Sequence, residues 1–303
     1  FVTEACEYMD SFLSLKPMAE VILNIDSDHL DYFRDIEHIA ESFGTFARLV
    51  PPEGFIVAYD ANPFVTTAVR DLPCKVIRFG FNETSDYYAK NIRFNGRGCP
   101  AYDLYRDGVY QDTLQLAVPG EHNVANSLAA IATCTELGAS ARCIKETLES
   151  FTGTQRRFDI QGVTAGGVTV VDDYAHHPTE IRATLAAAQN VPHERLWCLF
   201  QPHTYTRTRA LFEEFADALS AADAVVLAEI YAAREKNIYH ISAETLAERI
   251  KELHPEKEVY FMPDFREMAD FVLKTTAKGD MVMTMGAGDI YRVGELILGA
   301  EPK

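Results

Sequence analysis

Hydrophobic residues in the second half of the chain fall into short runs that alternate with amphipathic stretches. The β-rich runs cover residues 167–171, 196–200, 224–230, 258–262 and 281–285. Helical patterns lie between and after them, at 179–189, 208–221, 242–253, 264–275 and 289–298. Several of these helices open on Ser, Thr or Asp, which suit helix N-caps. Strands that alternate with helices predict a parallel sheet with crossover helices, and therefore a complete Rossmann-like, doubly wound domain.

The first half has a mixed pattern of strands and helices. Strands are expected at 19–24, 54–59 and 75–79, and helices at 36–49, 63–71, 123–137 and 140–150. Residues 87–118 alternate polar and apolar positions around Asn95-Gly96 and Asp107-Gly108, and the second pair is a strong hairpin signal. We expect this stretch to form an antiparallel flap. Taking Thr152-Gly153-Thr154 as a hinge predicts an α/β protein with domains at 1–153 and 154–303.

Length, composition and charge exclude several classes of protein. A chain of 303 residues favours two domains, and its 48% apolar and 24% charged residues are ordinary for a globular protein. No apolar run approaches the roughly 20 residues that span a bilayer, so no membrane segment is expected. The net charge of −17 argues against nucleic acid as a partner. The six cysteines form no C-x-x-C pair, which indicates reduced thiols and a cytoplasmic protein.

The opening residues predict a chain that begins inside a domain. Phe-Val-Thr-Glu-Ala-Cys-Glu resembles the end of a buried strand that runs into acidic residues. It has neither an initiator methionine nor the pattern of a signal peptide. We therefore expect a protein truncated at its N-terminus.

Polar clusters follow the expected strands, where ligands of open parallel sheets bind. They are residues 172–178, 201–208 and 286–289 in the second half, and 4–7 and 26–29 in the first half. Asp172-Asp173 can serve as helix caps, but the nearby His176-His177 pair favours a functional role. His203 and Arg207 add capacity to bind an anion near a helix N-terminus.

Two further features are weaker. Gly286-Ala287-Gly288 is not a G-x-G-x-x-G fingerprint, because Tyr291 fills the third glycine position. Glu4 and His29 are candidate magnesium ligands, although Mg²⁺ prefers oxygen and a histidine there is equally a polar residue at a strand end.

Ordered strings along the whole chain resemble the Mur ligase family. They are Glu4-Ala5-Cys6-Glu7, Asp10-Ser11-Phe12-Leu13, residues 24–31, 119–126 and 153–159, then Asp172 to Glu180 and Phe200 to Thr208. The last two strings resemble the alanine-adding member most. The resemblance implies a truncated central ATPase domain, with a mixed sheet and helices, followed by a Rossmann-like domain that binds the amino acid.

The resemblance also implies a reaction and its residues. ATP phosphorylates the carboxylate of UDP-N-acetylmuramate, and the amine of L-alanine attacks the acyl phosphate. Glu4 and His29 would serve Mg²⁺. In ATP, Asn123 and Asn126 would face the adenine, Arg157 the phosphates and Asp173 the ribose. The alanine would be held by Tyr174, His176, His203 and Arg207.

Two departures from the family pattern matter. Thr204 stands where some relatives have a second basic residue, so alanine binding would depend more on Arg207. The chain also contains no Gly-Lys dipeptide, and therefore no G-x-x-x-x-G-K-[ST] phosphate loop. We expect this loop and the sugar-binding domain to lie in a missing N-terminal segment, and the chain alone not to ligate.

Other functions stay open. The murein-peptide ligase adds a tripeptide to the same muramate substrate and shares the His-His-Pro-Thr string, but residues 201–207 favour the alanine enzyme. Folylpolyglutamate synthase is a more distant possibility. A nicotinamide-dependent oxidoreductase is disfavoured, because no G-x-G-x-x-G motif follows the first strand of the second half. A non-catalytic binding module is the remaining alternative.

Overall fold

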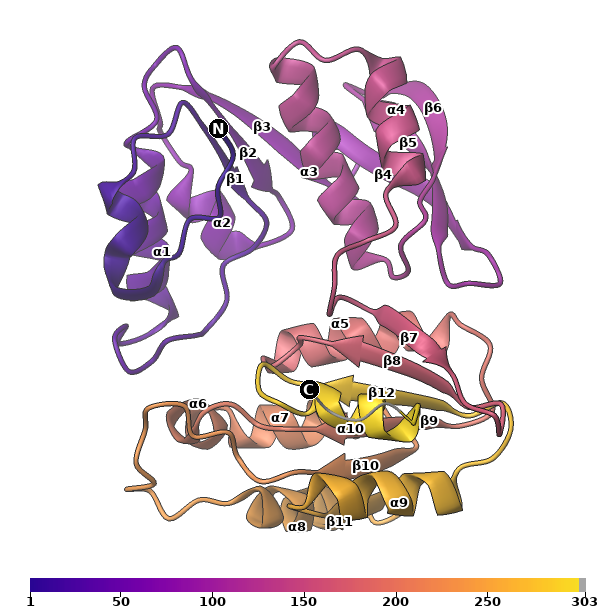
Figure 1. Ribbon diagram of the computed structural model, residues 1–303. Coiled ribbons are helices and arrows are strands. Elements are labelled where there is room, and N and C mark those ends of the chain that lie inside the picture. The colour runs from indigo at the N-terminus through magenta and orange to yellow at the C-terminus, as the bar shows by residue number, and fades with distance from the viewer. Residues whose placement is uncertain (300–303) are drawn as a thin grey trace. The chain divides into compact units, whose positions relative to one another are not determined.

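The computed structural model describes residues 1–299 and divides them into two compact units (Figure 1). Unit 1 comprises residues 1–95 and 99–151, and unit 2 comprises 96–98 and the chain from Thr152 onward. Each unit holds one six-stranded sheet with helices packed on it. The predicted α/β class is therefore confirmed.

The sheet of unit 1 follows the order of the sequence. Its strands are β1 (Ala19–Ile22), β2 (Phe55–Tyr59), β3 (Lys75–Gly80), β4 (Tyr87–Phe94), β5 (Pro100–Arg106) and β6 (Val109–Gln115). The pairs from β1 to β4 are parallel, and those from β4 to β6 are antiparallel. The antiparallel strands and the turn at Asp107-Gly108, with positive φ at both residues, are confirmed. The pairing of Phe79 with Tyr87 joins these antiparallel strands to β3, so they continue the same sheet.

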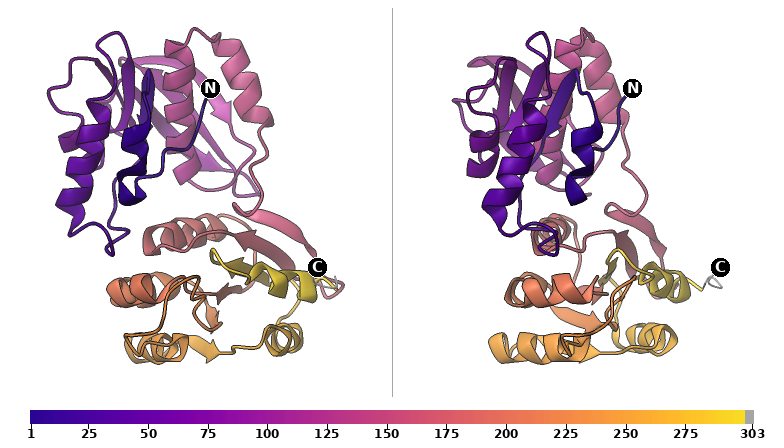
Figure 2. Two further views of the ribbon diagram at one scale, coloured as in Figure 1. Left: turned by 60° about the vertical axis from the view of Figure 1, so that its left-hand side comes forward. Right: turned by 90° about the vertical axis from the view of Figure 1, so that its left-hand side faces the viewer.

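Helices cover both faces of this sheet (Figure 2). They are the 3₁₀ helix η1 (Tyr8–Ser14), α1 (Ile36–Ala47), α2 (Pro63–Ala68), α3 (His122–Glu136) and α4 (Ala141–Ser150). Asp35, Asn62 and Ser140 cap α1, α2 and α4 by accepting from backbone N–H groups. One apolar core joins α1 and α2 to the sheet, and a second joins α3 and α4 to its other face.

The first seven residues form no strand, so that expectation is wrong. Phe1 and Val2 are fully exposed, and regular structure starts with η1 at Tyr8. A strand needs a neighbour to pair its backbone N–H and C=O groups, and the described residues supply none here.

Unit 2 has a doubly wound sheet with one antiparallel edge. Its strands are β7 (Asp159–Val163), β8 (Thr169–Asp173), β9 (Leu196–Phe200), β10 (Ala224–Leu227), β11 (Glu258–Phe261) and β12 (Met281–Met285), in the order β11-β10-β9-β12-β8-β7. All pairs are parallel except β7 with β8. The sequence analysis missed β7, because its apolar residues Ile160 and Val163 face solvent and contribute no core pattern.

The helices of unit 2 lie on two faces. They are α5 (Pro178–Gln189), α6 (Tyr205–Ala210), α7 (Phe212–Leu219), α8 (Ala243–Leu253), α9 (Phe265–Thr275) and α10 (Tyr291–Ile297). Side chains of α5, α7 and α8 share one core, and those of α9 and α10 share the other. The single helix predicted at 208–221 is wrong. Helix starts at Tyr205 and is interrupted at Leu211, whose backbone leaves helical geometry while its side chain enters the core.

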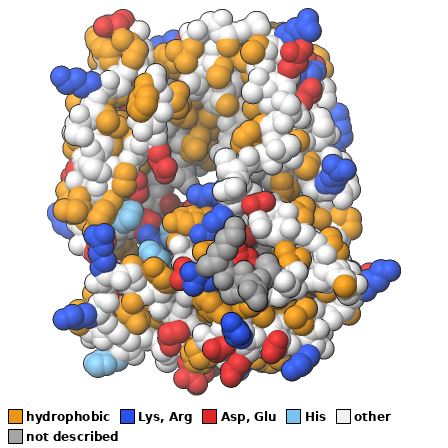
Figure 3. All heavy atoms as spheres, in the orientation of Figure 1, with side chains coloured by type: hydrophobic (Ala, Val, Ile, Leu, Met, Phe, Trp, Pro, Cys, Tyr) orange, Lys and Arg blue, Asp and Glu red, His pale blue; other side chains and the backbone are white. Residues whose placement is uncertain are grey.

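Within the described residues, no helix is long and apolar enough to span a bilayer. Acidic and basic side chains are interspersed over the face that Figure 3 shows. All six cysteines lie in the described chain, and the structure shows no disulfide among them.

Candidate functional site

Three polar clusters meet at one edge of the unit 2 sheet. Strand β12 lies between β8 and β9, and its last residue, Met285, pairs with Asp173 on one side and Phe200 on the other. The carboxyl ends of these three strands therefore lie side by side where the strand order reverses. Such a reversal is where open α/β sheets bind ligands.

His203 and Arg207 form the basic part of this cluster. Arg207 Nη1 donates to the His203 carbonyl oxygen at 2.8 Å and lies 3.3 Å from His203 Nδ1. Burial, together with the positive charges of Arg207 and His176, lowers the pKa of His203. His203 is therefore neutral near pH 7. Because a guanidinium only donates, Nδ1 is the acceptor and Nε2 carries the proton.

The cluster continues with Tyr174 and His176 from the end of β8, and Arg157 joins them from the segment just before β7. The His176 ring lies 6.0 Å from the His203 ring and 5.3 Å from the Tyr174 ring. Glu180 lies 3.3 Å from His176 Nδ1 and 3.6 Å from the Arg157 guanidinium, which also covers the Tyr174 ring. The structure thus brings together all four residues predicted for alanine, and Arg157 with them.

His177 has a structural role that its neighbour His176 does not share. It is the N-cap of α5 and forms a capping box with Glu180, while Pro178 takes the first helical turn, as predicted. Of the His176-His177 pair, His177 is thus committed to holding the helix and His176 reaches the cluster.

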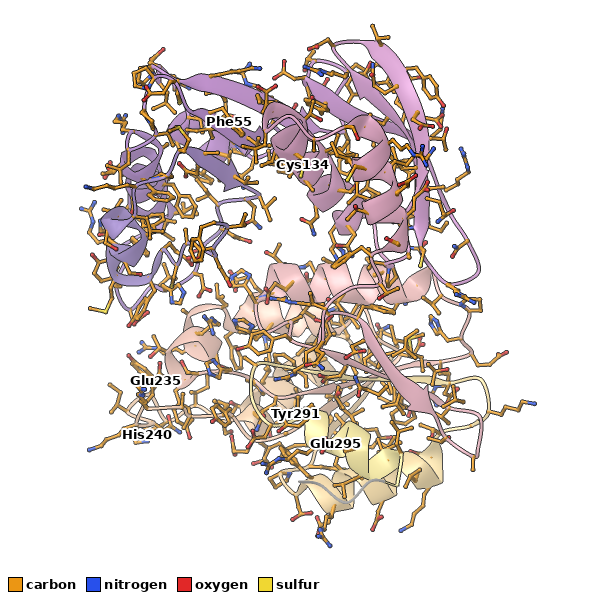
Figure 4. The ribbon with its side chains drawn as sticks, turned by 45° about the horizontal axis from the view of Figure 1, so that its top comes forward. Phe55, Cys134, Glu235, His240, Tyr291 and Glu295 are labelled. Atoms are coloured by element: carbon orange, nitrogen blue, oxygen red, sulfur yellow. The ribbon has the colours of Figure 1, made fainter. Side chains whose placement is uncertain are left out.

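Two residues that the sequence analysis missed complete the site. Tyr231 follows β10, and its ring stacks on His203 at 5.5 Å with an interplanar angle of 13°. Glu235, from the loop between β10 and α8 (Figure 4), accepts from the Thr204 hydroxyl at 2.5 Å and from the Thr206 N–H at 2.8 Å. The strand-end rule could have found Tyr231, because it was applied to β8, β9 and β12 but not to β10.

An ion pair between Arg156 and the buried Asp172 carboxylate lies beside the cluster. Arg156 Nε donates to Asp172 at 2.9 Å, and its Nη2 donates to the Gly286 carbonyl oxygen at 2.7 Å. The guanidinium lies 5.0 Å from the centre of the Tyr174 ring and 4.9 Å from the centre of the Tyr291 ring. Thr284 also donates to Asp172. Sequence alone does not show which of the adjacent residues Arg156 and Arg157 faces inward.

The Asp173 carboxylate forms its hydrogen bonds with residues of unit 2. Its carboxylate accepts from the Phe158 N–H at 2.7 Å, the Ala175 N–H at 2.8 Å and the Thr184 hydroxyl at 3.3 Å. The side chain is buried, and burial raises its pKa. These contacts show a structural role, and the ribose contact predicted for Asp173 stays a prediction.

The Gly286-Ala287-Gly288 turn fits closely against Gln201. A Cβ at Gly288 would lie 2.3 Å from Gln201 Oε1, the atom that accepts from the Asp289 N–H. Gly286 has φ +145°, and a Cβ there would lie 2.7 Å from the Gln201 carbonyl oxygen. The two glycines thus allow the ends of β9 and β12 to approach each other.

The predicted magnesium residues lie in unit 1. Glu4 is exposed, and His29 Nε2 lies 3.5 Å from Glu7 and 3.9 Å from Asp28. No group of three or more His, Cys, Asp or Glu side chains that could hold a metal occurs among residues 1–299. The magnesium contacts predicted for Glu4 and His29 therefore stay a prediction.

The predicted adenine residues occupy the first turns of α3. Asn126 Nδ2 donates to Asn123 Oδ1 at 3.0 Å, and Asn123 Nδ2 donates to the Pro119 carbonyl oxygen at 2.8 Å. Asn126 is exposed. An exposed amide offers a donor and an acceptor together, which matches the edge of an adenine.

Comparisons with known proteins agree on one family. Residues 1–134 match the Mur ligase middle domain, and residues 156–288 match the Mur ligase glutamate ligase domain. The chain is 46% identical, over 98% of its length, to the UDP-N-acetylmuramate--L-alanine ligase of Caldanaerobacter subterraneus, and 49% identical over 98% to that of Lachnospira eligens. Each alignment covers 64% of the relative.

A solved structure agrees with these relatives. The UDP-N-acetylmuramate-alanine ligase MurC of Thermotoga maritima matches with a TM-score of 0.76 and 27% identity, over 96% of this chain and 61% of that one. The chain belongs to the Mur ligase family, as its sequence strings predicted. It spans about two thirds of the length of the curated relatives it matches.

Proposed function

We propose that this chain is the part of an ATP-dependent ligase that handles the nucleotide and the amino acid when L-alanine is joined to UDP-N-acetylmuramate. The reaction passes through an acyl phosphate, yields ADP and phosphate, and serves peptidoglycan synthesis in the cytoplasm. Support comes from relatives of that name at 43–49% identity and from the cluster at the carboxyl ends of β8, β9 and β12.

The pairing of His203 with Arg207 carries the proposal. Arg207 offers guanidinium N–H groups, and neutral His203 offers its Nε2 proton, so both donate to an anion. An amino acid substrate has a carboxylate of that kind, and a guanidinium binds it with charge-assisted hydrogen bonds. Held by its carboxylate, the alanine directs its amine toward the acyl phosphate. The chemistry then depends on orientation rather than on a covalent enzyme intermediate.

Nucleotide contacts complete the proposal. Asn123 and Asn126 hold the adenine, while Arg157 and Asp173 contact the phosphates and the ribose. Glu4 and His29 serve Mg²⁺, which neutralises phosphate charge when bound. For Arg157 the support is its exposed guanidinium beside Tyr174.

The acceptor separates this proposal from its nearest rival. The test uses a hybrid enzyme, in which this chain replaces the matching portion of the Caldanaerobacter relative. Phosphate release by the hybrid enzyme is measured with ATP and UDP-N-acetylmuramate. Release that requires L-alanine is the expected result. Release that requires a tripeptide would transfer the assignment to the murein-peptide ligase, and no release with either acceptor would leave a binding module.

The chain by itself is a separate test. We propose that its 303 residues alone do not ligate, because they contain no phosphate-loop sequence to supply backbone N–H groups, a lysine and a magnesium-binding hydroxyl. A coupled assay should detect no alanine-dependent ADP release above background. Release at the rate of the hybrid enzyme would contradict this part of the proposal.

A further inference from the structure

Unit 1 contains a pocket that none of the proposed ligase residues lines. Its volume is about 500 Å³, within the range of small-molecule sites. The sheet side is formed by Tyr87, Leu104, Arg106 and Leu114, and the helix side by residues of α3, α4 and their connection, among them Ile131 and Ile144. The pocket is therefore a slot between a sheet and a helix layer, with mostly apolar walls.

Sheet register explains why these side chains share the slot. Tyr87 of β4 pairs directly with Arg106 of β5, and Leu104 lies two residues before Arg106 on the same face. The Arg106 guanidinium lies 5.3 Å from the centre of the Tyr87 ring. A hydroxyl and a cation therefore stand together at one end of an apolar slot.

The Tyr87 hydroxyl is a buried donor that has the Thr135 side chain as its polar neighbour. The residue is 3% exposed, and its oxygen has no hydrogen-bond partner among the described residues. Thr135, in the same pocket, donates to the Ile131 carbonyl oxygen at 2.7 Å. Burial raises the pKa of Tyr87 more than Thr135 and Arg106 lower it, so the hydroxyl keeps its proton. A buried polar group in this state favours a ligand that accepts from it.

Arg106 is the least neutralised cation of the pocket. Lys145 lies 2.8 Å from Asp112, and Arg142 lies 2.7 Å from Glu146. The carboxylate of Glu149 accepts from the Gln115 N–H. Among the described residues, the ion-pair partner of Arg106 is the exposed Asp107 carboxylate, at 3.5 Å. A negative group inside the pocket would therefore meet Arg106 and the Tyr87 hydroxyl together.

We propose that this pocket is a second ligand site, which binds a flat apolar molecule carrying one carboxylate. The apolar body lies between Leu104 and Leu114 on the sheet and Ile131 and Ile144 on the helices. The carboxylate accepts from Tyr87 and pairs with Arg106. The proposal does not depend on the ligase reaction, because the pocket lies wholly in unit 1 and shares no residue with the nucleotide or alanine contacts.

The test measures binding of 2-naphthoate to the 303-residue chain by ligand-observed NMR and calorimetry. Saturable binding is expected, with none for the cation 2-naphthylmethylammonium. Tyr87→Phe and Arg106→Gln should each raise Kd about tenfold, as loss of a charge-assisted hydrogen bond predicts. Ala139→Trp, at the exposed rim, should block the slot.

Tyr88→Phe is the matched control. Tyr88 is equally buried on β4 but points to the opposite face, where it stacks on Tyr105. The Kd of 2-naphthoate for the Tyr88→Phe variant should equal that for the unaltered chain. A thermal unfolding transition establishes for each variant that the protein is folded. The proposal is overturned if 2-naphthoate shows no saturable binding. It is equally overturned if Tyr87→Phe and Arg106→Gln bind 2-naphthoate as tightly as Tyr88→Phe does.

Discussion

The buried carboxylates of the two sheets differ in their hydrogen-bond partners. In unit 2, Asp172 and Asp173 end β8 and accept hydrogen bonds from side chains or backbone N–H groups on both of their oxygens. In unit 1, Glu20 lies in the edge strand β1, is 6% exposed, and its Oε2 has no partner among the described residues. Partnered carboxylates brace the end of a sheet, whereas an unpartnered one stays protonated and makes its strand sensitive to pH.

Topology explains where the partners come from. Insertion of β12 between β8 and β9 places the ends of three strands within reach of one another. In unit 1 the parallel strands β1 to β4 also end side by side, but they follow the order of the sequence and their order does not reverse. The cluster of histidines and arginines lies at the convergence of unit 2. The comparison indicates that the reversal of strand order, rather than parallel pairing alone, assembles the candidate site.

The largest expected effect is the pH dependence of unit 1. Burial raises the pKa of Glu20 from 4.5 to about 8. The folded state therefore binds this proton more tightly than the unfolded state does. The resulting stability is fully present below pH 4.5 and is lost as pH rises through 8. Each pKa unit is worth about 1.4 kcal/mol, so the free energy of unfolding should fall by about 4 kcal/mol between pH 5 and 9.

Hydrogen exchange of β1 and β2 measures this effect in unit 1. Glu20→Gln should remove most of the pH dependence, because glutamine does not ionise. Equal pH dependence in the variant and the unaltered chain would show that another group is responsible.

The next effect concerns the ion pair between Arg156 and the buried Asp172 carboxylate of unit 2. Asp172→Ala leaves Arg156 and Thr284 without their partner and should lower the free energy of unfolding by about 3 kcal/mol. Urea unfolding followed by the fluorescence of Trp197 reports this, because the chain has one tryptophan and it is buried in unit 2. Glu213→Ala, which breaks the surface pair with Arg249, should cost less than about 1 kcal/mol. Equal losses would contradict the bracing role of Asp172.

A smaller effect is expected from the glycine turn. Gly286→Ala adds a Cβ against the Gln201 carbonyl oxygen at a positive φ, and it should cost about 2 kcal/mol in the same assay. Gly96→Ala is the control, since a Cβ there meets nothing within 4 Å. If both variants are equally stable, the strand ends do not need this close approach.

The smallest expected effect is the change in the pKa of His203. Burial and the charges of Arg207 and His176 lower the pKa of His203, so an NMR titration should place it below 6.5. The stability that His203 contributes is present above pH 6.5 and is lost as pH falls through the folded pKa. Arg207→Gln should move this pKa upward, and an unchanged value would show that Arg207 does not act on the ring.

The sequence predicted the fold more completely than the site. Two strands, 196–200 and 281–285, were predicted to the residue, because wholly apolar runs mark buried parallel strands. Strand β7 was missed because its apolar residues are exposed, and the break at Leu211 follows from tertiary packing that no local pattern shows.

At the site, polar residues after strands predicted which side chains gather, including His176, His203 and Arg207. The role of each individual residue could not be predicted. Only the folded chain shows that His177 caps a helix, that Arg156 faces inward, or that Glu235 holds Thr204 from 31 residues away.

The most direct test compares two arginines of α6 in the hybrid enzyme. Arg207 belongs to the cluster, whereas Arg209 lies over the ring of Tyr239. Arg207→Ala should raise the KM for L-alanine at least about 30-fold, as loss of a charge-assisted contact predicts, while the KM for ATP changes little. Arg209→Ala should leave both values near those of the unaltered hybrid. If the two variants have the same KM for L-alanine, the cluster at the strand ends is not the amino-acid site.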